Sequence, residues 1–110
     1  MEFIYLPAFV KQLKALAKKY PSIKKDIAGL LKQLEKKPLM GNEIGKNCYK
    51  IRMAISSKGK GKSGGARVIT CAKIKDDRIF FLSIYDKSEQ SSITDPELKV
   101  FIRLIEENYG

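Results

Sequence analysis

The chain of 110 residues carries a formal net charge of +10, with 44% hydrophobic and 31% charged residues. This length fits a single domain over residues 1–110 with a buried core, and the composition excludes a disordered basic tail. No apolar run approaches the roughly 20 residues that span a membrane, and the first residues lack the pattern of a secretory signal, so we expect a cytoplasmic protein with no membrane partner.

The first 40 residues predict a strand followed by two helices. Residues 2–6 are rich in Phe, Ile and Tyr, which are favoured in strands. Apolar residues then recur every three or four positions over 9–20, which is the period of an amphipathic helix. A second helix with the same period is expected over 23–34, with Ser22 as its cap. We expect the two helices to pack as a hairpin that ends before Gly41.

The second half of the chain predicts three strands and a closing helix. Apolar residues alternate over 48–55 and again over 67–75, as in strands of an antiparallel sheet. Residues 79–85 are almost all apolar, which predicts a central strand covered on both faces. Asp95 and the proline after it are expected to cap and begin a last helix that runs to Tyr109. The predicted fold is therefore α+β in the order β-α-α-β-β-β-α, with a twisted, mainly antiparallel sheet, the helical hairpin on one face and the C-terminal helix closing the core.

The positive charge is concentrated in residues 46–75, which hold nine of the 22 basic side chains and none of the 12 acidic ones. At the centre of this stretch, cations alternate with glycines in the order Lys58-Gly-Lys-Gly-Lys-Ser-Gly-Gly-Ala-Arg67. Glycines let backbone amides approach a ligand closely, and long cationic side chains attract a polyanion. We therefore expect one strongly positive face whose natural ligand is a phosphate polymer, with a merely solvated loop as the alternative.

Two other kinds of site are not supported by the sequence. The Gly-Lys-Ser at residues 61–63 resembles the end of a P-loop, but Ser56 stands where the first glycine is required, and a strand rather than a helix follows. Cys48 and Cys71 lack metal-binding spacing, and the chain has no histidine. We therefore expect no metal and no cofactor, and we expect both cysteines to pack in the core.

Two segments resemble the RelE/ParE superfamily of toxins from type II toxin-antitoxin pairs, most closely its HigB-like branch. In residues 50–67 a basic loop enters a strand at Gly-Gly-x-Arg, and in residues 81–89 a strand ends with Ile-Tyr-x-Lys-x-Glu. Both segments are similar to the frame of that family's active site, and the predicted element order agrees over nearly the whole chain. Ser88 stands where archetypal RelE-like sequences have an arginine, a change that the HigB-like branch tolerates.

The resemblance implies a ribosome-dependent endoribonuclease, or mRNA interferase. Such a toxin cuts messenger RNA in the A site of the 70S ribosome, inhibits translation and is held inactive by a cognate antitoxin. Charge and periodicity alone predict only that the protein binds a phosphate polymer. Two alternatives therefore stay open: a noncatalytic module that binds RNA or the ribosome through the same patch, and a gyrase-directed ParE-like toxin, which shares the fold but generally lacks this basic set.

Metal-independent RNA cleavage by a 2′ hydroxyl needs a base, stabilisation of charge on the phosphorane and a donor for the leaving oxygen. Because the chain has no histidine, crowding of the loop cations is expected to lower the pKa of at least one lysine, which can then act as the base. Arg67 is the expected bidentate clamp for phosphate, and Tyr85 is expected to stack on a base or donate to phosphate. The catalytic candidates are Lys58, Lys60, Arg67, Tyr85 and Lys87; the candidates for binding RNA or the ribosome are Lys46, Lys50, Arg52, Lys62 and Lys73.

Overall fold

The computed structural model describes residues 1–110, and its three helices and five-stranded sheet confirm the predicted α+β fold class. Most of the predicted elements are present, and a further short strand appears between the second helix and the sheet. The elements are β1 (Glu2–Tyr5), α1 (Pro7–Lys19), α2 (Ile23–Lys36), β2 (Asn42–Gly45), β3 (Cys48–Met53), β4 (Ala66–Lys73), β5 (Arg78–Asp86) and α3 (Asp95–Tyr109), with short 3₁₀ turns at Ser56–Lys58 and Ile74–Asp76.

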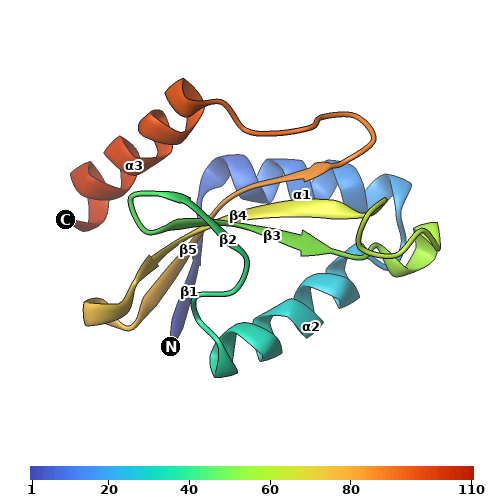
Figure 1. Ribbon diagram of the computed structural model, residues 1–110, viewed down its shortest axis with the longest axis horizontal. Coiled ribbons are helices and arrows are strands. Elements are labelled where there is room, and N and C mark those ends of the chain that lie inside the picture. The colour runs from blue at the N-terminus through green and yellow to red at the C-terminus, as the bar shows by residue number, and fades with distance from the viewer.

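The five strands form one twisted sheet in the order β1-β5-β4-β3-β2 (Figure 1). Strand β1 runs parallel to β5, and the other three pairs are antiparallel. Strand β5 lies inside the sheet and almost all of its residues are buried, as its continuous apolar sequence predicts. The mainly antiparallel sheet of the sequence prediction is thus confirmed.

Apolar layers cover both faces of the sheet. Helices α1 and α2 pack on one face around buried residues such as Phe9 and Phe81. Helix α3 packs on the other face through Leu98 and Ile105 (Figure 1). Because side chains alternate between faces, each strand can send one set of residues toward the hairpin and the other toward α3. None of the helices combines the length and the apolar content that crossing a membrane requires.

Strand β2 is an element that the sequence did not predict. Its four residues, 42–45, are mostly exposed and show no apolar alternation, because an edge strand needs to pack only one side chain. It joins β3 through a tight turn in which Lys46 and Asn47 have positive φ values of 50° and 65°. Positive φ at two successive positions is the geometry of a type I′ hairpin, in which asparagine is tolerated.

The start of α3 differs from the prediction by one residue. Thr94, rather than Asp95, is the N-cap, and its hydroxyl accepts a hydrogen bond from the backbone amide of Glu97. The Glu97 carboxylate in turn accepts from the backbone amide of Thr94, which completes a capping box. Asp95 is instead the first helical residue, where its negative charge still favours the positive end of the helix dipole.

The two cysteines lie opposite each other on β3 and β4, and both are buried on the face that α3 covers. Cys48 and Cys71 are free thiols. Their position among apolar side chains agrees with the predicted packing role.

Candidate functional site

The basic loop, residues 54–65, connects the end of β3 to the start of β4 and lies beside the end of β5. It makes a very close backbone approach at Gly65, where a side chain would put its first carbon 2.2 Å from the carbonyl oxygen of Met53. Only glycine fits there. Gly59 and Gly61 have positive φ values of 71° and 64°, so the glycines between the lysines serve the turns of the loop.

The first anchor of the loop is on α2. The Asp26 carboxylate accepts a 3.0 Å hydrogen bond from the backbone amide of Ser56 and another from the hydroxyl of the same residue. The hydroxyl of Ser22 accepts from the backbone amide of Ser57 at 2.8 Å. Ser22 occupies the predicted N-cap position of α2, but its side chain makes no capping hydrogen bond because it is used here.

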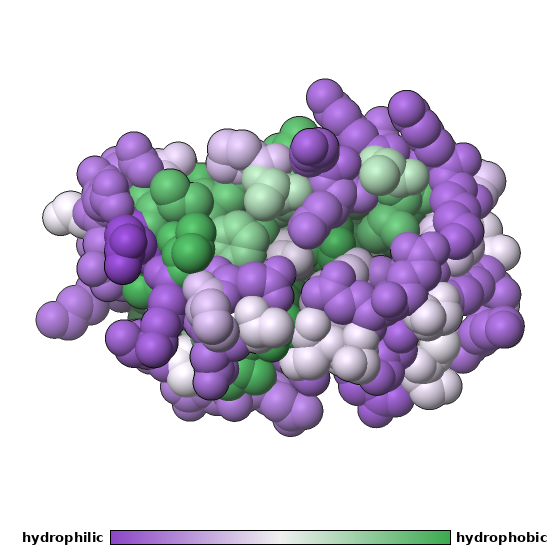
Figure 2. Space-filling view, turned by 90° about the horizontal axis from the view of Figure 1, so that it is seen from above, coloured by the Kyte–Doolittle hydropathy of each residue, from purple (hydrophilic) through white to green (hydrophobic).

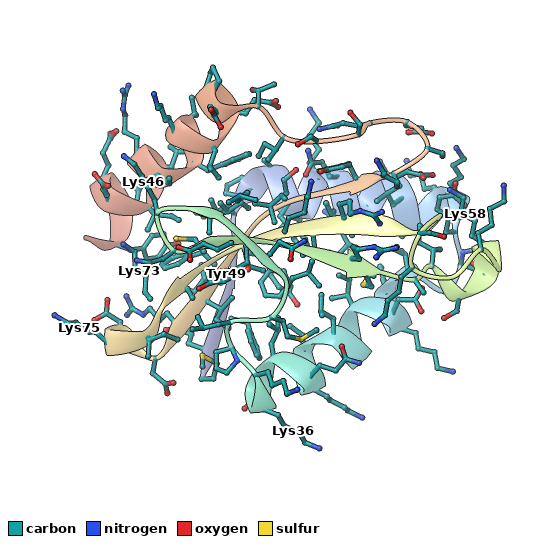
Figure 3. The ribbon with its side chains drawn as sticks, in the orientation of Figure 1. Lys36, Lys46, Tyr49, Lys58, Lys73 and Lys75 are labelled. Carbon is teal, nitrogen blue, oxygen red and sulfur yellow. The ribbon has the colours of Figure 1, made fainter.

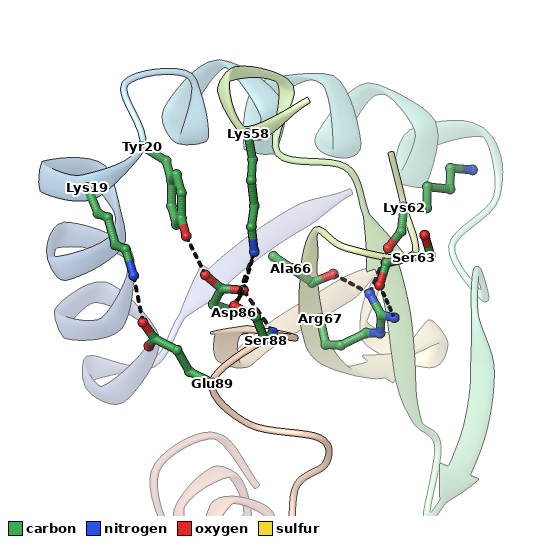
Figure 4. A network of polar contacts seen from close by, with 10 residues as sticks. All are labelled: Lys19, Tyr20, Lys58, Lys62, Ser63, Ala66, Arg67, Asp86, Ser88 and Glu89. Carbon is green, nitrogen blue, oxygen red and sulfur yellow. Dashed lines mark hydrogen bonds and ion pairs between the residues drawn. The ribbon is translucent and has the colours of Figure 1, made fainter. Parts of the chain in front are cut away.

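The second anchor is an ion pair beneath the loop. The Lys58 ammonium lies 2.7 Å from Oδ1 of Asp86, and the two side chains are only 12% and 0% exposed. The hydroxyl of Tyr20 donates to the other oxygen of Asp86, and the backbone amide of Ser88 donates to Oδ1 at 3.0 Å (Figure 4). Asp86 therefore joins α1, the loop and the end of β5.

This environment corrects one expectation about the loop. The hydrogen bond to Asp86 raises the pKa of Lys58, so the predicted lowering of a lysine pKa by crowding is wrong for this residue. Burial alone would raise the pKa of Asp86, but hydrogen bonds from Lys58, Tyr20 and Ser88 outweigh it and hold that pKa far below its ordinary value. Both groups are consequently charged at neutral pH.

The third anchor is Arg67, near the start of β4. Its Nη1 donates to the carbonyl oxygens of Lys62 at 2.9 Å and Ala66 at 3.1 Å, and its Nη2 donates to that of Ser63 at 3.4 Å (Figure 4). The residue is 6% exposed. In this conformation both amino groups hold the loop, so the planar fork is not open to clamp a phosphate as the sequence suggested.

Tyr85 lies opposite Arg67 across β4 and β5, so the two residues are neighbours, as expected if these strands pair. Its ring is buried on the α3 face, so in this conformation it does not present a surface on which an RNA base can stack. Its hydroxyl is also buried and has no hydrogen-bond partner. Burial raises the pKa of Tyr85, so the phenol keeps its proton and remains a donor.

Five further candidates lie at or near this end of the sheet. Lys60 and Lys62 are exposed, and neither forms an ion pair. The backbone amide of Lys87 donates to the carbonyl of Gly65 at 3.0 Å, which ties the end of β5 to the loop. Arg52 and Lys62 line the same depression of about 250 Å³ beside α2, and Lys50 is two residues before Arg52 on β3.

The other two candidates, Lys46 and Lys73, lie at the opposite end of the sheet. Lys46 precedes β3 and Lys73 ends β4, whereas the loop begins after Met53. Figure 3 shows this separation between Lys58 on one side and Lys46, Lys73 and Lys75 on the other. Six residues of β3 span about 20 Å. The nine cations are therefore spread along the length of the strands, with the loop cations at one end of the sheet and Lys46, Lys73 and Lys75 at the other.

Sequence reasoning missed the acidic part of the site. Asp86 lies within the motif Ile-Tyr-x-Lys-x-Glu, at the position between the tyrosine and the lysine. A carboxylate that ends a continuous apolar strand must find a cationic partner if it is buried, and that signal was available. The contributions of Tyr20 and Asp26 had no such signal, since they depend on how the helical hairpin packs against the loop.

The family model described as the RelE toxin of the RelE / RelB toxin-antitoxin system matches residues 11–108. The chain belongs to the RelE toxin family. The match includes the anchored loop, its partners Asp86 and Arg67, and both segments on which the resemblance to the superfamily rested. RelE toxins act in pairs with an antitoxin, so the expected toxin role and antitoxin partner are supported at the level of the family. Membership in the HigB-like branch stays a prediction.

Proposed function

We propose that this RelE family toxin is a ribosome-dependent endoribonuclease that cuts messenger RNA in the A site of the 70S ribosome. The observation that supports the proposal best is the triple anchoring of the loop 54–65, which carries the unpaired lysines Lys60 and Lys62 and is held by Arg67. A loop needed only for affinity can remain loose, whereas catalysis needs groups held close to one geometry. Three separate anchors favour catalysis.

The proposed reaction is the attack of a ribose 2′ hydroxyl on the adjacent phosphorus, without a metal. The hydroxyl proton passes to a base, the bond between phosphorus and the 5′ oxygen breaks, and that oxygen takes up a proton. The products are a 2′,3′-cyclic phosphate and a 5′ hydroxyl. The site must therefore supply a general base for the 2′ hydroxyl, a general acid for the 5′ oxygen and at least one fixed positive charge near the phosphorus.

The environment of each residue suggests its part. Lys58 keeps its proton because its pKa is raised, which suits it to stabilise negative charge rather than to act as the base. Lys60 is the proposed base, since it is exposed and forms no ion pair. Lys87 is the proposed donor; Tyr85 also keeps its hydroxyl proton, but its buried hydroxyl can take this part only if the α3 face opens. Arg67 supplies positive charge and fixes the loop.

The test is single-turnover cleavage of an end-labelled messenger RNA on ribosomes stalled at a known codon. We expect cuts within the A-site codon, and far slower cutting of the same RNA without ribosomes. If the toxin binds the ribosomes and leaves the RNA intact, the noncatalytic binding module is correct. Inhibition of gyrase supercoiling with no RNA cleavage would support the ParE-like alternative instead.

Binding to ribosomal or messenger RNA should weaken steeply as salt rises. Lys60→Ala and Lys62→Ala should each reduce the slope of log affinity against log salt by about one counterion, because each lysine is expected to neutralise one phosphate. Lys11→Ala is the matched control, since it removes an exposed lysine from α1. Slopes that respond equally to all three substitutions would mean that the loop has no special place in RNA binding.

A further inference from the structure

A second surface lies at the end of the sheet that is remote from the loop. There an open cavity of about 470 Å³ is lined by the start of β3, the end of β4 and the chain that follows α2. Its apolar wall includes Leu39, Tyr49 and Ile74, and its cationic wall is formed by Lys73 and Lys75. A volume of this size is in the range of ligand-binding cavities.

The charge around this cavity is mainly positive. Lys73 and Lys75 line it directly, and Figure 3 places Lys46 on the same side of the molecule. Asp76 is the one acidic residue in the lining. The surroundings therefore favour a negatively charged ligand.

The apolar part decides the class of that ligand. Leu39 is 52% exposed and Ile74 is 53% exposed, although both are large aliphatic side chains. Recognition of single-stranded RNA uses exposed aromatic rings or arginine planes for stacking, but Tyr49 is buried and the lining cations are lysines. Exposed aliphatic groups within a polar rim instead mark a protein interface. The ligand that fits is an acidic segment with apolar side chains.

Helix α3 offers the other exposed apolar surface, with Val100 and Leu104. On the face that Figure 2 shows, green apolar areas are separated by purple polar side chains. The sequence of α3 contains four acidic residues and two basic ones. The negative charge of α3 would repel an acidic partner, so the cavity is the better docking site for such a partner.

We propose that the cavity between Leu39, Tyr49 and Ile74, flanked by Lys73 and Lys75, is a docking site for an acidic, amphipathic segment of the antitoxin. The proposal rests on the toxin role, but it does not need the cleavage reaction. Apolar side chains of the segment enter the cavity, and its carboxylates meet the lysines. Because the cavity lies about 20 Å from the loop along β3, the docked segment leaves Lys60 and Lys62 uncovered.

The test compares two double variants that change the same kinds of residue. Ile74→Asp with Lys75→Glu alters the cavity, and Lys99→Glu with Val100→Asp makes an identical change of charge and polarity on α3. All four side chains are exposed, so both variants should fold. Each is titrated with the purified antitoxin encoded next to the toxin gene, and separately with a single-stranded oligonucleotide of uridine.

The cavity variant should bind the antitoxin about 100-fold more weakly than the wild type, and the α3 variant should bind within about threefold of it. Cleavage by the cavity variant should stay at the wild-type rate, and in cells its toxicity should no longer be relieved by the antitoxin.

Unchanged antitoxin affinity of the cavity variant would overturn the proposal, and so would a loss of antitoxin affinity confined to the α3 variant. A loss of oligonucleotide binding with antitoxin binding intact would overturn it in favour of an RNA contact. If the wild type cuts no RNA, the comparison of antitoxin affinities still decides the docking site.

Discussion

Arg67→Ala should lower the single-turnover rate of messenger RNA cleavage by about 10² to 10³, because it removes a fixed positive charge and also the hydrogen bonds that hold the loop in one geometry. The structure gives two reasons for a large effect. The guanidinium holds the loop carbonyls of Lys62 and Ser63, so its loss frees the segment that carries Lys60. It also places a positive charge opposite Tyr85. Binding should suffer less, by no more than about a hundredfold, since one cation among several is lost.

Arg67→Lys separates the two contributions of this side chain. Lysine restores the charge, but a single ammonium cannot bridge several carbonyls as the planar fork does, so cleavage should stay at least about tenfold below the wild type. Unfolding of each variant is measured in parallel, because the loss of these hydrogen bonds should also cost about 1–3 kcal/mol of stability. Equal losses in binding and cleavage would show that Arg67 only holds the RNA.

Asp86→Ala should be among the most destabilising single substitutions in the chain, at about 3–5 kcal/mol by denaturant unfolding at neutral pH. The buried carboxylate joins three parts of the structure, through Lys58, Tyr20 and Ser88. Without it, the part-buried Lys58 ammonium and the Tyr20 hydroxyl lose their partner and the loop loses one anchor.

Glu89→Ala is the matched control for this ion pair. The Lys19–Glu89 pair has the same 2.7 Å separation, but its side chains are 56% and 59% exposed. Solvent screens such a pair, so its loss should cost less than about 1 kcal/mol. Similar costs for the two variants would mean that burial does not strengthen the contacts of Asp86.

The same carboxylate predicts how stability depends on pH. Because the pKa of Asp86 is depressed in the folded protein, its contribution is fully present above the ordinary carboxyl pKa of about 4 and is lost as the pH falls below that value toward the folded pKa. The gap in stability between wild type and Asp86→Ala should therefore be constant from neutral pH down to about pH 5 and should shrink in stronger acid. A gap that stays constant in acid would show that the folded and unfolded pKa values of Asp86 are alike.

The sequence by itself determined the elements and their class. Periodicity is a local property, so the amphipathic helices and the continuous apolar strand β5 could be located from their own residues. That Tyr85 lies within reach of Arg67 if the two strands pair could also be predicted, but the exact register depends on an irregularity between Ile69 and Thr70. Strand β2 was not predicted, because the sequence of an exposed edge strand shows almost no apolar alternation.

Only the tertiary structure decided the chemistry of the site, because charge and pKa depend on neighbours that are distant in sequence. The run of cations in residues 46–75 was expected to form one positive face, and it is the pairing of the strands that decides where along the sheet each cation lies. Crowding of the loop cations predicted that at least one lysine is less basic, but the fold places Asp86, 28 residues away in sequence, against the ammonium of Lys58. Arg67 was expected to bind phosphate through both amino groups. Because the side chain is buried, its donors must be satisfied, and they bond to the carbonyls of the loop instead.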